Sequence, residues 1–288
     1  MAKLIFGCGY LGLRVARLWK AAGEEVYAAT RSSGRAEQLA AEGLRPVVAD
    51  VTDENWRGEG LPPKLDTALF AVGYDRAAGL PIHSVYAGGL ANVLTQLPAK
   101  TERVIYISST GVYGDVAGER VDEDTPCRPT RDGGKASLAA EQLLQASPFT
   151  QRSIILRLAG IYGPGRIPRS ADLLAGRPID APAAGWLNLI HVEDAARIVL
   201  LAAERAPLPS LYVVSDGQPV IRGYYYRELA RLLGAPPPTF GSPAAESPAA
   251  QRAGSDKRID PARLFSTLSP QLMFPSYREG LAAIVAAV

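Results

Sequence analysis

Three glycines near the start of the chain have a spacing that suits the binding of a pyrophosphate. Gly7, Gly9 and Gly12 form a G-x-G-x-x-G pattern directly after a short apolar run that ends at Phe6. This pattern lets a strand turn sharply, brings the backbone close to a pyrophosphate and allows the next helix to pack near the strand. Apolar residues recur at helical spacing from Leu11 onward. These flanks favour a dinucleotide-binding turn over a glycine turn of purely steric origin.

The residues after the second apolar run, 25–30, bear on the choice of dinucleotide. A site for NAD usually carries an acidic residue at this place, where it accepts hydrogen bonds from the ribose hydroxyls. This chain has Thr30 there, followed by Arg31, Ser32 and Arg35. Guanidinium forks and hydroxyl groups suit a 2′-phosphate. We therefore expect NADP, with NAD as the alternative. A plain surface role for Arg31 at the start of a helix stays open.

A second set of reactive side chains follows the fifth apolar run, which covers residues 103–108. Three consecutive hydroxyl residues end with Ser109 and Thr110, and Lys135 opens an alanine-rich helical stretch further along. Asp50 follows the third apolar run, residues 45–49, where its carboxylate could accept a hydrogen bond from an adenine amino group. All of these positions fall at the carboxyl ends of predicted strands or the start of a helix, which is where parallel α/β sheets bind ligands.

The elements that must position these residues alternate regularly. Strands are expected over 4–6, 25–30, 45–49, 66–72, 103–108 and 153–158, and helices after the glycine turn and over 33–42, 81–97 and 134–146. A long loop is expected over 111–130. Such alternation predicts an α/β fold with a doubly wound parallel sheet, a Rossmann fold, and helices on both faces.

Beyond Gly160 the regular alternation of predicted strands and helices ends, which indicates a smaller C-terminal lobe that closes over a substrate. We expect a short strand over 187–190, a helix over 192–203, a strand over 211–214 that returns to the main sheet, and a C-terminal helix over 277–288. The predicted division assigns 1–163 and 188–218 to the dinucleotide-binding domain, and 164–187 and 219–288 to the substrate lobe. The Pro-, Ala- and Ser-rich segment 235–250 is expected to be a linker or a mobile loop.

Composition excludes several classes of partner. The chain has 288 residues, with 31 basic and 29 acidic side chains, a balance that does not suggest binding to nucleic acid or to a membrane surface. Two cysteines indicate no disulfide framework, and neither histidine lies in a metal-binding or triad pattern. The first strand is expected almost at once, without a leader. These features predict a cytoplasmic protein. We expect it to act on a small molecule, as a monomer or a homodimer.

Five stretches taken together resemble one known family. They are the glycine turn, Asp50, Ile105-Tyr-Ile-Ser-Ser-Thr-Gly-Val-Tyr-Gly114, Arg157-Leu-Ala-Gly-Ile-Tyr-Gly-Pro-Gly165 and Asn188-Leu-Ile-His-Val-Glu-Asp194. In order and spacing they resemble the extended short-chain dehydrogenase/reductase family of nucleotide-sugar epimerases and dehydratases, over nearly the whole chain. The cofactor-binding residues that we expect are Gly7, Gly9, Tyr10, Leu11, Gly12, Arg31, Ser32, Arg35, Asp50, Val51, Ala71 and Lys135.

The resemblance also implies a catalytic set, from which this chain departs. In the family, a hydroxyl at the position of Ser109 binds the reacting oxygen of the substrate. A Tyr acts as general acid or base, and a Lys four residues later lowers the pKa of that Tyr. When Lys135 is aligned with the family Lys, Arg131 stands where the Tyr belongs. Arginine stays protonated and is no ordinary proton shuttle. The sequence resembles an atypical branch that lacks the Tyr.

Three interpretations follow from this departure. In the first, the protein is an NAD(P)-dependent epimerase, dehydratase or reductase of a polar substrate, with nucleotide-sugars as candidates. Ser109 or Thr110 orients the carbonyl, and Lys135, Asp132 or a tyrosine such as Tyr74 or Tyr162 moves the proton. In the second, the chemistry is different and Arg131 binds an anionic group of the substrate. In the third, the protein is a catalytically silent NADP-binding redox sensor or regulator. The candidate catalytic residues are Ser109, Thr110, Lys135 and Arg131.

Overall fold

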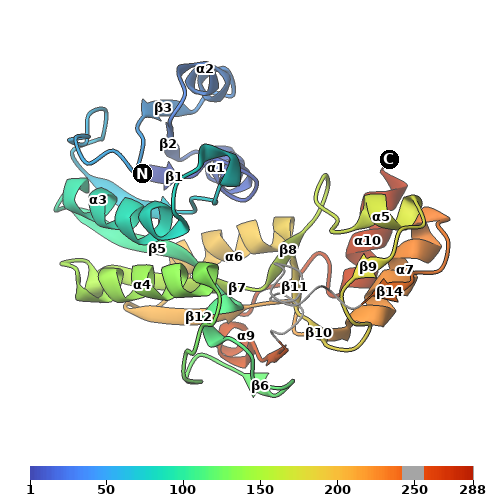
Figure 1. The fold of residues 1–288 in the computed structure, drawn as a ribbon. Coiled ribbons are helices and arrows are strands. Elements are labelled where there is room, and N and C mark those ends of the chain that lie inside the picture. The colour runs from blue at the N-terminus through green and yellow to red at the C-terminus, as the bar shows by residue number, and fades with distance from the viewer. Residues whose placement is uncertain (242–255, 288) are drawn as a thin grey trace. The chain divides into compact units, whose positions relative to one another are not determined.

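A seven-stranded sheet forms the centre of the larger part of the chain (Figure 1). The structure is a computed structural model that describes residues 1–241 and 256–287. The strands are ordered β12-β7-β5-β4-β1-β2-β3, and the neighbouring pairs from β5 to β3 are parallel. Their bounds are β1 Ala2–Phe6, β2 Glu25–Thr30, β3 Arg45–Val48, β4 Leu65–Phe70, β5 Thr101–Ser109, β7 Ser153–Leu158 and β12 Ser210–Val214. The predicted Rossmann fold is confirmed.

Helices cover both faces of this sheet because successive residues of a buried strand point to opposite sides. Leu4 and Phe6 of β1 belong to one apolar cluster with Leu90 of α3 (Gly89–Gln96) and Leu144 of α4 (Asp132–Ala146). Ile5, between them, faces Gly12 at the start of α1 (Gly12–Ala21). The other long helices here are α2 (Ser33–Ala41) and α6 (Val192–Arg205).

The order of the strands creates a switch point beside β1. The chain runs from β1 to β2 and β3 on one side, and then crosses to β4 on the other side of β1. The connections that leave β1 and β4 therefore diverge, and they leave a crevice at the carboxyl ends of the strands.

The chain divides into two compact units. Unit 1 comprises 1–112, 132–157 and 196–212, and unit 2 comprises 113–131, 158–195 and the described residues from 213 onward. Unit 2 has its own core, which includes Tyr162, Leu189, Tyr225 and Leu281. The boundaries of the two functional domains expected from sequence stay a prediction.

Unit 2 is built from short elements. Its helices are α5 (Ser170–Leu174), α7 (Arg222–Leu233), α9 (Ala262–Leu268) and α10 (Tyr277–Ala286). Its strands pair two by two: β6 (Arg120–Val121) with β15 (Arg258–Ile259), β8 (Gly160–Tyr162) with β11 (Leu189–His191), β9 (Ile179–Asp180) with β14 (Phe240–Gly241), and β10 (Trp186–Leu187) with β13 (Val220–Ile221).

Three predicted elements differ from the structure. The helix expected over 81–97 is a π-helical turn, η2 (Ser84–Gly88), that continues into α3. The strand expected over 187–190 is two strands, because β10 pairs antiparallel and β11 pairs parallel, and the change of partner falls at Asn188. The loop expected over 111–130 contains β6 and the end of a 3₁₀ turn, η3 (Thr110–Tyr113). A further 3₁₀ turn, η4 (Thr150–Arg152), precedes β7.

Within the segment 235–250, residues 235–239 form neither helix nor strand, the next two residues form β14, and the rest, from residue 242, lies outside the described residues. Within residues 1–241 and 256–287, no helix is both long and apolar enough to cross a membrane.

Candidate functional site

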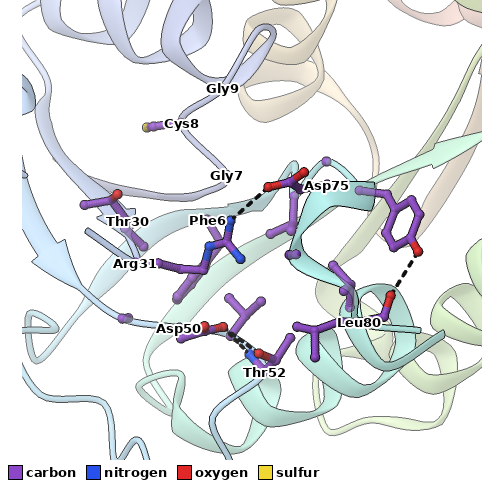
Figure 2. Close-up of a pocket in the computed structure, with 18 of the residues that line it drawn as sticks. Phe6, Gly7, Cys8, Gly9, Thr30, Arg31, Asp50, Thr52, Asp75 and Leu80 are labelled. Atoms are coloured by element: carbon purple, nitrogen blue, oxygen red, sulfur yellow. Dashed lines mark hydrogen bonds and ion pairs between the residues drawn. The ribbon is translucent and has the colours of Figure 1, made fainter. Parts of the chain in front are cut away.

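A cavity of about 390 Å³ lies at the switch point in unit 1 (Figure 2). Its walls come from the residues that follow four neighbouring strands: Gly7 after β1, Arg31 after β2, Asp50 after β3 and Val72 after β4. The volume falls within the range of small-molecule and cofactor sites. All of the residues that line the cavity belong to unit 1.

Two of the three motif glycines are required by the fold itself. Gly7 has a φ of +93°, and a Cβ there would lie 2.5 Å from the carbonyl carbon of Ala71. This close approach accompanies the hydrogen bond from the Ala71 amide to the Phe6 carbonyl, 2.8 Å. A Cβ on Gly12 would overlap the carbonyl oxygen of Gly7. The glycines at 7 and 12 therefore let β1, β4 and α1 meet.

The fold itself does not require a glycine at position 9, where Gly9 stands. It is exposed, its φ lies outside the left-handed region, and no heavy atom lies within 4 Å of the place where a Cβ would be. It lines the cavity just before the N-terminus of α1. The missing side chain leaves open space where a pyrophosphate would approach the backbone and the positive end of the helix dipole. This cradle fits the phosphate groups of a dinucleotide.

Cations line the cavity beyond β2. Arg31 and Arg35 both contribute to the wall, and the Arg35 guanidinium donates to the neutral amide oxygen of Gln38, 2.7 Å. Ser32 caps α2, because its hydroxyl oxygen accepts a hydrogen bond from the Arg35 amide at 3.2 Å. The hydroxyl proton of Ser32 is not used in that bond, so the group keeps a donor.

The wall after β3 is held by local hydrogen bonds. One carboxylate oxygen of Asp50 accepts from the Thr52 amide at 2.9 Å and from the Thr52 hydroxyl at 2.7 Å. The amide side chain of Asn92, on α3, donates to the carbonyl oxygen of Val51 at 3.0 Å. Asn92 therefore has a structural role, as a support for the cavity wall.

The opposite wall is the loop after β4, which contains the 3₁₀ turn η1 (Arg76–Ala78). Asp75 caps this turn by accepting a hydrogen bond from the Ala77 amide, 2.9 Å. The Tyr74 hydroxyl donates to the Leu80 carbonyl oxygen at 2.9 Å and ties the two ends of the loop together. Asp75 also pairs with Arg31 across the cavity, 3.6 Å between Oδ2 and Nη2 (Figure 2).

Cys8 also borders the cavity. Burial raises the pKa of its thiol to about 12. The thiol therefore stays protonated at neutral pH, and the residue offers a small apolar surface and no nucleophile.

The candidate catalytic residues of unit 1 lie on two elements that contact each other, β5 and α4, or, in the case of Thr110, directly after β5 at the start of η3. Ser109 is exposed at the end of β5, where its hydroxyl oxygen accepts from the Gly111 amide at 3.1 Å, and Thr110 is buried beside it. Lys135 is exposed in the first turn of α4, which also holds Asp132.

A buried ionic network fixes β5 against α4. Glu141, on α4, accepts from the Ser108 hydroxyl at 2.5 Å and from the Arg157 guanidinium at 3.0 and 2.7 Å. All three side chains are almost fully buried. Because Ser108 precedes Ser109 and Glu141 lies on the helix of Lys135, the network fixes the two elements that carry the candidate catalytic groups.

The remaining candidates lie in unit 2. Arg131 is half-buried just before α4. Tyr162 is buried in the core of unit 2, where its hydroxyl donates to the Ser276 carbonyl oxygen at 3.4 Å. Burial raises the pKa of Tyr162 far above its ordinary value. Such a phenol is poorly suited to take up a proton from a substrate at neutral pH.

Six of the predicted cofactor residues line the cavity, namely Gly7, Gly9, Arg31, Arg35, Asp50 and Val51. The other six lie outside its lining: Tyr10 and Leu11 lie within the glycine turn, Gly12 begins α1, Ser32 caps α2, Ala71 packs on Gly7, and Lys135 lies on α4. In the wall after β4, Tyr74 was named from sequence only as a candidate to move a proton, and Asp75 and Leu80 were not predicted. The position of this wall after the strand beside β1 is the signal that could have revealed it.

Across residues 1–241 and 256–287, no group of three or more His, Cys, Asp or Glu side chains is placed to hold a metal ion.

Comparison with known proteins agrees with this geometry. Residues 4–215 match the sequence model of the NAD dependent epimerase/dehydratase family. Over 94% of its length, the chain is 28% identical to Protein YeeZ of Escherichia coli strain K12, of which 95% is covered.

Two other matches extend the range of relatives. The chain is 26% identical to a 4-hydroxy-2-methyl-3-oxo-4-farnesyl-3,4-dihydroquinoline-1-oxide ketoreductase of Stigmatella aurantiaca, with 94% of this chain and 83% of that protein covered. The fold of this chain is similar to that of the UDP-glucose 4-epimerase of Thermus thermophilus, which was solved in complex with NAD. That match has a TM-score of 0.80 and 20% identity, and it covers 99% of this chain and 98% of that one.

Proposed function

Because the chain belongs to the NAD dependent epimerase/dehydratase family, we propose that it is an NADP-dependent oxidoreductase, epimerase or dehydratase of a polar substrate, with nucleotide-linked compounds as candidates. The family membership supports a nicotinamide cofactor and epimerase- or reductase-like chemistry. The choice of NADP, the substrate class and the catalytic residues are our proposals.

The observation that carries the proposal is the cavity at the switch point. Gly9 leaves a cradle that the fold itself does not need, and two arginines line the wall after β2 where a site for NAD usually has an acidic residue. In our assignment, Arg31 and Arg35 bind the 2′-phosphate, Asp50 and Val51 border the adenine, and the turn at Gly9 holds the pyrophosphate.

The chemistry of the proposed reaction divides between cofactor and protein. The bound nicotinamide supplies hydride exchange. The Ser109 hydroxyl is exposed at the end of β5 and would hydrogen-bond the reacting oxygen of the substrate. Lys135 and Asp132, in the first turn of α4, would move the proton in place of the missing Tyr. Arg131 would bind an anionic group of the substrate.

Two measurements test the cofactor. Isothermal titration calorimetry of the purified chain with NADP⁺ and NAD⁺ should give tighter binding of NADP⁺. Arg31→Ala should remove most of this preference, a loss of about tenfold or more in NADP⁺ affinity, because an ionic hydrogen bond to the phosphate is lost. Tighter binding of NAD⁺, or no effect of Arg31→Ala, would show the assignment to be wrong.

The reaction is tested by turnover. NADPH oxidation and NADP⁺ reduction are followed by absorbance in the presence of nucleotide-sugars and polar ketones. Ser109→Ala and Lys135→Ala should abolish any activity found while leaving the fold intact, and Lys100→Ala, a change at another exposed lysine, should not. Equal activity of all three variants would refute the catalytic assignment.

A cofactor-binding regulator is the second candidate function. It is favoured by our alignment, which puts Arg131 at the position of the family Tyr. It is also favoured by the burial of Tyr162 and by the hydrogen bond of Tyr74 to Leu80, which leave neither phenol poised as a replacement. Tight binding of NADP⁺ without turnover across the substrate screen would support this function over catalysis.

A further inference from the structure

Asp75 lies opposite the arginine that we assign to the 2′-phosphate. Its Oδ2 is 3.6 Å from Nη2 of Arg31, and the two side chains point toward each other across the cavity (Figure 2). They come from different walls, since Arg31 follows β2 and Asp75 caps the turn η1 after β4. The free protein therefore holds a carboxylate where the proposed ligand would bring another anion.

The two oxygens of Asp75 have different roles. Oδ1 accepts the hydrogen bond from the Ala77 amide that caps η1, and Oδ2 faces Arg31. The amide oxygen of an asparagine could accept the same capping bond. The charge of Asp75 is therefore not needed for the local fold of its loop, which the bond between Tyr74 and Leu80 also holds.

The charges around the cavity show what the carboxylate changes. Four ionisable side chains with a formal charge line it: Arg31, Arg35, Asp50 and Asp75. Asp50 is held by Thr52, and Arg35 by the neutral Gln38. Asp75 thus balances the cation most directly opposite it. A 2′-phosphate carries about −1.5 to −2 charges at neutral pH, so it would have to compete with this carboxylate and would be repelled by it.

We propose that Asp75 is a specificity-determining residue that limits the preference for NADP over NAD, because the 2′-phosphate must displace its carboxylate from Arg31. The inference rests on the proposed NADP function. NAD lacks the phosphate, so it can bind while the ion pair between Arg31 and Asp75 stays intact. Asp75 therefore makes the difference between the affinities for NADP and for NAD smaller than it would be with Arg31 and Arg35 alone.

The test compares Asp75→Asn with a matched control. Asp53→Asn removes the same charge from an exposed residue that also caps a turn, by accepting from the Asn55 amide at 2.8 Å, but that does not line the cavity. Calorimetry at low salt should show NADP⁺ binding about three- to tenfold more tightly to the Asp75→Asn variant, from the lost ion pair and the lost repulsion of the phosphate. NAD⁺ affinity should change by less than about twofold, and Asp53→Asn should change neither affinity.

The outcomes separate this inference from the proposed function. If Arg31→Ala weakens NADP⁺ binding but Asp75→Asn leaves the ratio of the two affinities within about twofold of wild type, the inference is wrong and the NADP assignment stands. Equal tightening of both cofactors by Asp75→Asn would also overturn it, as would weaker NADP⁺ binding. If NAD⁺ binds the wild type more tightly than NADP⁺, the NADP assignment and this inference both fail.

Discussion

Replacement of Gly9 by alanine separates folding from cofactor binding. A Cβ at this position would meet no heavy atom within 4 Å, and the backbone φ lies outside the left-handed region. The change should therefore leave the fold intact. Because alanine restricts the unfolded chain more than glycine does, the free energy of unfolding should rise by about 0.4–1 kcal/mol.

Cofactor affinity should respond in the opposite direction. The added methyl group would occupy the cradle that we assign to the pyrophosphate. Forcing an extra methyl group into a filled contact costs about 1–3 kcal/mol. That cost corresponds to a rise of about 5- to 150-fold in the Kd of the dinucleotide.

Urea denaturation and calorimetry with NADP⁺ measure the two effects on the same samples. Gly88→Ala is the matched control, because a Cβ at Gly88 is equally unobstructed but lies outside the cavity lining, so its binding should stay that of the wild type. Gly12→Ala should instead lower the free energy of unfolding by about 2 kcal/mol or more, because its Cβ would overlap the Gly7 carbonyl. A Gly9→Ala variant that binds NADP⁺ as the wild type does would refute the assignment of the cradle.

Three further changes test the interior of each unit. Glu141→Gln should lower the free energy of unfolding by about 3–5 kcal/mol in urea titrations, because it removes the negative charge that pairs with the buried Arg157 guanidinium. Ser108→Ala should cost less, about 1–3 kcal/mol, since one hydrogen bond to the carboxylate is lost. In unit 2, burial raises the pKa of Asp216 to about 7. Its charged form is disfavoured in the fold, so wild-type stability should fall as the pH rises from about 4 to about 7, by up to about 4 kcal/mol from this group. In Asp216→Asn, the free energy of unfolding should depend less on pH over this range. An unchanged dependence on pH would contradict the raised pKa of Asp216.

The alternation of strands and helices can be predicted from sequence because long elements carry a clear hydrophobic period. The predicted strands from β1 to β5 and the glycine turn agree with the structure within a few residues, and the turn locates the first wall of the cavity. The arginines after β2 follow from the same topology, because the strand before them is recognisable in the sequence.

The contacts that could not be predicted join residues far apart in the chain. Glu141 and Arg157 are 16 residues apart, and nothing in their local pattern indicates that they meet in the interior. The two-residue strands β6 and β15 are too short to show a period. Asn188 is a similar case: its side-chain amide donates to the Lys257 carbonyl and accepts from the Ile259 amide, so it joins β15 to the break between β10 and β11.

Asp75 escapes prediction for a different reason. The strand before it is predicted, but the loop after that strand contains no glycine motif or charge cluster that marks a site. Its pairing with Arg31 depends on the order of the strands, which brings the end of β4 beside β1 and places it across the cavity from β2.

The edge of the sheet at β3 has a consequence for self-association. This strand has only β2 as a neighbour, and its other side carries no further strand in the described sheet. Three of its four residues, including Arg45 and Pro46, are exposed. An edge strand that is short, charged and interrupted by proline is a poor template for another strand, because proline has no amide proton to donate. A homodimer of this protein would therefore have to form through surfaces other than a continuous sheet across β3, and the same feature opposes strand-by-strand aggregation at this edge of the sheet.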